Sequence, residues 1–152
     1  MGQFGMDEEN EAEKKVETVE ELKKRRKAFA YWTVGGEDYK LKLTTQQICK
    51  LEEKFRCNLV TLIMQSGGLP QLGIMLTVIQ AAMTPWKHGV KYKDVQALYD
   101  QYADEGGTQM DLMVDVIMEI MLVSGFFTEN QRESVMDLMV DVIMEIMLVS
   151  GF

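Results

Sequence analysis

Few side chains in this sequence are suited to catalysis or metal binding. There is one histidine, His88, and there are two cysteines, Cys49 and Cys57. A catalytic triad needs a histidine beside a nucleophile, and a zinc site takes three or four closely spaced Cys or His ligands. The three residues fit neither arrangement, and positions 49 and 57 on one helix are about 12 Å apart, too far for a disulfide. We therefore expect free thiols, no metal site and no cofactor.

Three acidic residues, Asp111, Asp115 and Glu119, recur at helical spacing. Such a line of carboxylates could hold a cation, but it is more often the solvated face of an amphipathic helix. The glycine pairs that begin at positions 35, 67 and 106 are typical of turns and helix ends, and none belongs to a phosphate-binding loop. The sequence therefore gives no support to an enzyme, and we expect a protein that acts by association.

Composition and charge suit one domain that binds other proteins. Of the 152 residues 47% are hydrophobic, and 24 acidic against 16 basic residues give a net charge of −8, which disfavours contact with nucleic acid or anionic membranes. Residues 1–10 lack the basic and apolar regions of a secretory signal, and no long uncharged apolar run predicts a membrane span. We expect a cytoplasmic protein in a reducing compartment.

The N-terminal part of the chain predicts a charged segment over residues 1–27. It is acidic as far as position 21 and then basic from Lys23 to Lys27. Such a segment is typically solvated and mobile, although its basic end could also form a contact patch.

A β-hairpin is predicted over residues 29–43, around the turn Gly35-Gly36. A two-residue turn fixes the register, and the predicted cross-strand pairs are Val34 with Glu37, Trp32 with Tyr39, Ala30 with Leu41 and Ala28 with Leu43. Side chains of these pairs face the core, so Phe29 and Tyr31 face the opposite way. Two explanations stay open for these outward aromatics: an N-terminal helix covers them, or a partner binds them.

Capping motifs and apolar spacing predict four helices after the hairpin. Thr44 with Gln47 and Thr108 with Asp111 form capping boxes, and Pro70 is placed to open a helix. The predicted helices cover residues 45–66, 70–83, 92–105 and 109–124. The expected fold class is therefore mainly α: a small domain of four to five helices over residues 28–127 with an N-terminal β-hairpin.

The segment from Met110 to Phe126 recurs unchanged as residues 136–152, and the two copies hold eight of the 13 methionines. A solenoid would show sequence differences between its repeats and would contain more than two of them. The identity therefore indicates a recent in-frame duplication or an artefact, not a working repeat fold. Residues 128–152 predict an extra helix, capped by Thr128 with Gln131. Because the linker is short, we expect this helix to dock into a second molecule and to drive self-association.

Methionine-rich helices suit grooves that accept several apolar partners. We expect the binding surface to combine the outer face of the hairpin with apolar helix surface near the C-terminus. The candidate partner-binding residues are Phe29, Tyr31, Met113, Met121, Met139 and Met147. Replacing Phe29 and Tyr31 by serine is expected to weaken partner capture and to leave thermal stability nearly unchanged.

The order of motifs from Tyr39 to Phe127 resembles the small tail assembly chaperones of long-tailed phages, prophages and gene transfer agents. The motifs are Tyr-Lys-Leu-Lys-Leu-Thr-Thr, Ile-Cys-Lys-Leu-Glu-Glu-Lys-Phe, Gly-Gly-Leu-Pro, Tyr-Lys-Asp-Val-Gln-Ala-Leu-Tyr-Asp-Gln-Tyr and Val-Ser-Gly-Phe-Phe. The resemblance implies a non-enzymatic cytoplasmic protein of a bacterial host that coats the tape-measure protein and recruits tail-tube subunits. Residues 1–27 and the duplicated helix depart from the family's pattern.

A different class of function also stays open. The basic cluster Lys23–Lys27 beside Phe29 and Tyr31 could form a small nucleic-acid contact, as in a regulatory protein of a mobile element. The net charge and the absence of a basic recognition helix in the sequence argue against it.

Overall fold

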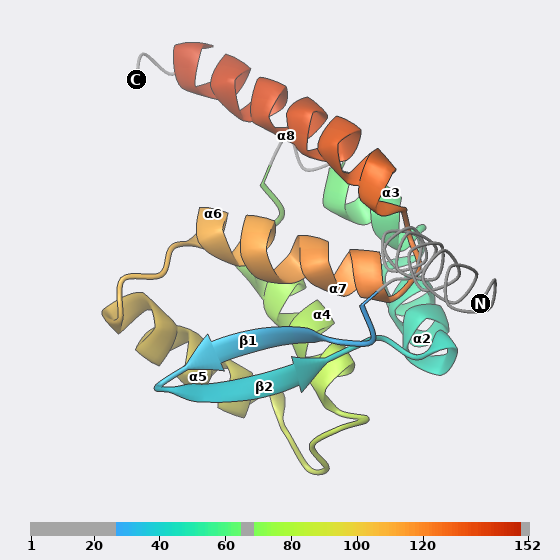
Figure 1. Cartoon of the computed structure of the whole chain (residues 1–152), viewed down its shortest axis with the longest axis vertical. Helices are drawn as coiled ribbons and strands as arrows, with labels where there is room; N and C mark the ends of the chain where they lie inside the picture. The colour runs from blue at the N-terminus through green and yellow to red at the C-terminus, as the bar shows by residue number, and fades with distance from the viewer. Residues whose placement is uncertain (1–26, 65–68, 150–152) are drawn as a thin grey trace, which may run out of the picture.

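The computed structural model describes residues 27–64 and 69–149 of the chain. Within these ranges the fold is mainly α with an N-terminal two-stranded antiparallel hairpin, as the sequence predicts. In Figure 1 the hairpin lies low on the molecule, a continuous helical stretch labelled α6 and α7 crosses above it, and the last helix, α8, lies at the top. The predictions for residues 1–26, including most of the basic cluster, lie outside the described residues.

The hairpin consists of β1 (Ala30–Val34) and β2 (Glu37–Leu41). The three predicted pairs within these strands are confirmed, with Tyr31 opposite Lys40 on the other face. The two turn glycines have φ angles of 61° and 77°, the left-handed conformation that a tight hairpin turn of this kind requires. Register and turn chemistry therefore agree, and Trp32 lies in the core with 1% of its surface exposed.

The tip of the hairpin is tied to the end of α5 (Tyr92–Asp104). The Gly35 N–H donates to both carboxylate oxygens of Glu105, at 2.8 and 3.0 Å. A Cβ at position 35 would overlap Nε2 of Gln101, so any other residue here would displace that side chain as well as strain the turn. The turn of the hairpin is thus fixed against the end of α5.

The prediction of a single helix over residues 45–66 was wrong, because the structure has two helices there. They are α2 (Thr45–Phe55), which Thr44 caps as predicted, and α3 (Leu59–Met64). Arg56 takes the left-handed conformation with φ at 56°, which ends α2.

Two side chains outside α3 accept hydrogen bonds from its first N–H groups. Asn58 Oδ1 accepts from Val60 N at 2.9 Å, and Glu52 Oε2 accepts from Leu59 N at 2.9 Å. These contacts satisfy donors that a new helix start would otherwise leave unpaired.

The nearly all-round apolar sequence of α4 (Leu72–Met83) predicts the most buried helix, which is wrong, because residues 112–117 bury four side chains and residues 118–123 bury five. Burial of α4 is less complete. The structure buries six of its side chains: Met75, Leu76, Val78, Ile79, Ala82 and Met83. It packs against α2, α5, β2 and the next helical stretch. The predicted helices 70–83 and 92–105 are confirmed to within two residues at each end.

The first copy of the repeat forms a continuous helical stretch with a π-helical middle: α6 (Gln109–Asp111), η1 (Leu112–Ile117) and α7 (Met118–Val123). The second copy lies in α8 (Glu129–Val149), where the same six residues, 138–143, are α-helical. Because the sequences are identical, the π-helix results from packing in the core and not from local preference.

The last helix begins by packing on its own domain, although the short linker predicted docking into a second molecule. The connection is short because α8 begins at Glu129, directly after the cap Thr128, and Gly125 turns the chain with φ at 90°. Phe127 and Met139 are 8% and 6% exposed, so the first half of α8 is packed on the domain. Among the described residues no helix is long and apolar enough to cross a membrane.

Candidate partner-binding surfaces

The outer face of the hairpin forms an aromatic and basic surface, here called the hairpin surface. It consists of Phe29, Tyr31, Lys40, Lys42 and Trp86. Tyr31 is 53% exposed and Trp86 is 41% exposed. The alternation along β1 places Tyr31 outward as predicted, whereas Trp86 comes from the loop after α4 and joins this face only through the tertiary fold.

Four of the five residues of the hairpin surface, all but Tyr31, are in contact with one another. The rings of Phe29 and Trp86 meet edge to face, with centroids 4.9 Å apart. Lys40 Nζ lies 4.3 Å from the centre of the Phe29 ring, and Lys42 Nζ lies 5.7 Å from it, within the range of cation–π attraction. Trp86 Nε1 donates to the carbonyl oxygen of Lys42 at 3.2 Å. Phe29 is thereby half-buried, and Tyr31 is the aromatic most available to a partner.

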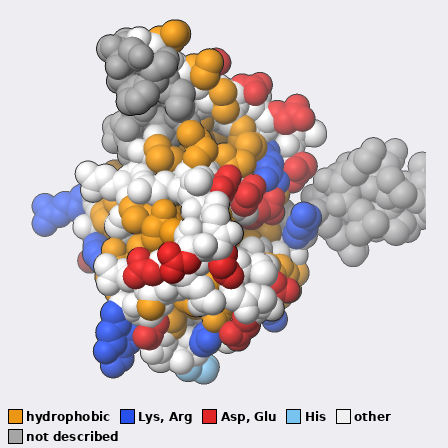
Figure 2. Space-filling model, turned by 90° about the vertical axis from the view of Figure 1, so that its left-hand side faces the viewer, with side chains coloured by type: hydrophobic (Ala, Val, Ile, Leu, Met, Phe, Trp, Pro, Cys, Tyr) orange, Lys and Arg blue, Asp and Glu red, His pale blue; other side chains and the backbone are white. Residues whose placement is uncertain are grey.

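A second apolar surface lies on α8 and is here called the α8 stripe. Val140, Met144 and Leu148 follow at intervals of four residues, which places them on one side of the helix. They are 50%, 54% and 73% exposed. Figure 2 shows hydrophobic side chains gathered over the upper part of the molecule, where α8 lies, with acidic side chains beside them.

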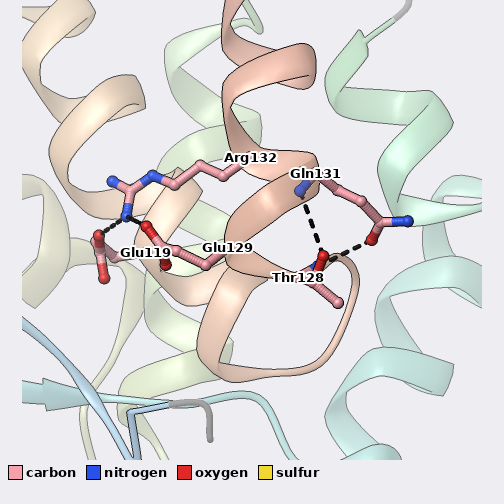
Figure 3. A network of polar contacts seen from close by, with 5 residues as sticks. All are labelled: Glu119, Thr128, Glu129, Gln131 and Arg132. Atoms are coloured by element: carbon pink, nitrogen blue, oxygen red, sulfur yellow. Dashed lines mark hydrogen bonds and ion pairs between the residues drawn. The ribbon is translucent and has the colours of Figure 1, made fainter. Parts of the chain in front are cut away.

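The beginning of α8 is fixed to the domain by polar contacts (Figure 3). Thr128 N donates to Gln131 Oε1 at 2.9 Å and Gln131 N donates to Thr128 Oγ1 at 3.3 Å, which confirms the predicted capping box. Arg132 forms an ion pair with Glu119 of α7, and its Nη1 atom lies 3.5 Å from Oε1 of Glu129. Because the Arg132 and Glu119 side chains are each 19% exposed, this pair is a partly buried anchor between α7 and α8.

The candidate methionines do not gather on one surface. Met113 and Met121 are 0% and 2% exposed and belong to the core, where no partner can reach them in this fold. Met139 lies on the buried side of α8 and is 6% exposed, and Met147 belongs to α8 with a side chain outside the described part. Among the described side chains of α8 the exposed methionine is Met144, which the sequence did not single out; its counterpart in the first copy, Met118, is buried.

The side chains best suited to chemistry are scattered or serve structural roles. A small hollow borders His88, but the carboxylate that lines it, Asp94, accepts from Lys91 N at 2.8 Å and so caps α5. Both cysteines are free thiols. Among the described residues no three His, Cys, Asp or Glu side chains gather as metal ligands.

The two perturbed tyrosines of the described chain are less acidic than usual. Burial raises the pKa of Tyr102 to about 12, and the negative charges of Asp111 and Asp115 add to the shift. Burial also raises the pKa of Tyr39, with a hydrogen bond to Glu37 as the second cause. Both phenols are therefore neutral at physiological pH, where neither can serve as a base.

Comparison with protein families assigns this chain to one of them. Residues 23–152 match a family of unknown function, DUF6096, and the chain belongs to it. A search of the curated proteins and a search of the solved structures found no match. The matched range includes the hairpin, all the helices described above and both copies of the repeat.

Proposed function

We propose that this chain is a non-enzymatic tail assembly chaperone of a phage or prophage, which binds the tape-measure protein and recruits tail-tube subunits in the bacterial cytoplasm. The sequence resemblance over residues 39–127 supports this proposal. Its structural support is the hairpin surface. Tyr31 and Trp86 are exposed there, although the domain has an apolar core large enough to bury them.

The chemistry of the hairpin surface describes the partner segment that would fit it. Aromatic side chains that are held rigidly lose little conformational entropy on binding, and for that reason they often dominate interface energies. Lys40 and Lys42 beside the rings favour a partner whose apolar side chains are flanked by carboxylates. An amphipathic helix of a long, helical partner such as a tape-measure protein has this character when its borders are acidic.

A capture experiment with the purified chain tests the proposal. Wild-type protein immobilised on a resin is expected to retain the tape-measure and tail-tube proteins of the same phage or prophage. Tyr31→Ser is expected to reduce this retention about tenfold, the loss of roughly 1.4 kcal/mol typical of an interface tyrosine. Because Tyr31 is 53% exposed, its replacement should leave the melting temperature nearly unchanged. Phe29→Ser is unsuited to this test, since Phe29 packs against Trp86 and its loss would also destabilise the fold.

The matched control is Leu138→Ser. Leu138 is 56% exposed, close to Tyr31 in this respect, but it lies on α8 and outside both surfaces defined above. It should capture both partners as the wild type does. Capture of neither protein by the wild-type chain, or equal capture by Tyr31→Ser, would contradict the proposal.

A second candidate function is binding of a nucleic acid, and lysines over aromatic rings are the observation that favours it. Single strands stack their bases on aromatic side chains while lysines contact phosphates. The net charge of −8 opposes it. Retention of a labelled oligonucleotide at low salt, lost in Lys40→Glu and on addition of salt, would support this function over the first.

A further inference from the structure

The α8 stripe is an apolar surface that the described part of the chain leaves uncovered. In the first copy of the repeat, the counterparts of Met144 and Leu148 are Met118 and Leu122, which are 1% and 3% exposed. The same side chains are therefore buried at one place in this fold and exposed at another. The groove that suits this sequence is already filled by the first copy, so nothing within residues 27–64 and 69–149 covers the stripe.

The charges around the stripe limit what can cover it. Acidic residues border the stripe, and all three are exposed: Asp137, Asp141 and Glu145. The only basic residue of α8 is Arg132, which is paired with Glu119. Two α8 stripes packed on each other would bring these carboxylates together without compensating cations, which is unfavourable. The stripe therefore suits an apolar surface with basic borders.

The hairpin surface has this complementary character. Tyr31 and Trp86 supply exposed apolar area, and Lys27, Lys40 and Lys42 lie around them. Glu119 lines the same hollow as Lys27 and Tyr31, but it is paired with Arg132. In Figure 1 the stretch from α6 to α7 lies between the hairpin and α8, so one molecule cannot bring its two surfaces together. They can meet only between two copies of the chain.

We propose that the α8 stripe of one copy packs on the hairpin surface of a second copy, with Met144 and Leu148 against Tyr31 and Trp86. The bordering carboxylates of α8 then lie near the lysines of the hairpin. Such a contact joins two different surfaces, so each pair leaves one of each kind free and assembly continues beyond the dimer.

The size of the two surfaces sets the expected strength of this contact. Each exposes apolar area on the order of 400 Å², so the contact buries roughly 800 Å² in total, below the 1,200 Å² or so of a stable interface. We therefore expect weak association, visible at concentrations of about 100 µM and above and reduced by salt, because part of the attraction joins exposed charges.

Two variants of the full chain test the proposal by light scattering after size exclusion. The stripe variant carries Met144→Gln and Leu148→Gln, and the hairpin variant carries Tyr31→Thr and Lys40→Glu. The wild type should show an average mass that rises beyond the dimer with concentration, whereas each variant alone should remain a monomer. An equimolar mixture of the two variants should form dimers and nothing larger, since it contains one intact surface of each kind.

A control and three outcomes make the test decisive. Leu138→Gln, on α8 but outside the stripe, should associate as the wild type does. Association of the hairpin variant alone would show that α8 pairs with α8, and a monomeric wild type at every concentration would show that no self-contact exists; either result overturns the proposal. So does a mixture of the variants that stays monomeric.

Circular dichroism and melting temperature must match the wild type for each variant. If a double variant is destabilised, the single changes Met144→Gln and Lys40→Glu take its place in the same mixing experiment. No tape-measure protein is present in these measurements, so a failure of this proposal leaves the proposed function standing, and failure of the capture experiment leaves self-association standing.

Discussion

The identical repeat allows one substitution to be made twice in the same sequence context. Leu112 is 0% exposed in η1, and its counterpart Leu138 is 56% exposed in α8. Removal of a buried leucine side chain lowers stability by roughly 3 kcal/mol, since both the burial and the surrounding contacts are lost. We expect Leu112→Ala to lower the free energy of unfolding by about this amount, and Leu138→Ala to lower it by less than about 1 kcal/mol.

Thermal and urea unfolding, followed by circular dichroism, measure this difference. For a domain of this length each kcal/mol changes the melting temperature by about 2–4 °C, so Leu112→Ala should melt roughly 6–12 °C below the wild type. Helix propensity and unfolded-state effects are matched, because residues 110–126 and 136–152 are identical. Equal shifts for Leu112→Ala and Leu138→Ala would refute the reasoning that the first copy is core and the second is surface.

Two further predictions concern single residues. The pKa of Tyr102 is about 12 in the folded chain against 10.0 for a free phenol, so the unfolded state loses this proton first and stability should fall as the pH rises from about 10 to 12. Tyr102→Phe should flatten that part of the pH–stability curve. Arg56 has a positive φ, and Arg56→Gly should raise the free energy of unfolding by about 0.5–1 kcal/mol in urea titrations; a loss of stability would show that its side chain matters more than its backbone.

Local sequence signals predicted the hairpin and most helices. The paired glycines at 35 and 36 fix the turn, and the alternation of Ala30, Trp32 and Val34 fixes the face, so the register follows from two agreeing signals. The break after α2 was missed because Arg56 is neither Gly nor Pro. Its left-handed conformation depends on the packing and capping of α3, including the acceptor that Glu52 supplies to Leu59.

The binding surfaces were predictable only in part. Alternation in β1 placed Tyr31 outside, but a loop residue such as Trp86 reaches that face through the tertiary path of the chain, which no local pattern records. The methionines show more clearly what local sequence cannot predict. Met118 and Met144 have identical neighbours in sequence and opposite environments, so local sequence could not have told them apart.

The duplication also affects the order of events during folding. When the core first closes around a helix of this sequence, two identical segments compete for one groove, and only the length of chain that joins each to α5 distinguishes them. The connection to the second copy is two to three doublings longer, which disfavours it by about 1.5 kcal/mol, or roughly tenfold. On the order of one molecule in ten would therefore first seat residues 136–152 in the core and expose residues 110–126. Such molecules must release that helix before the Arg132–Glu119 pair and the packing of Met139 can form. The repeat therefore creates a kinetic trap during folding.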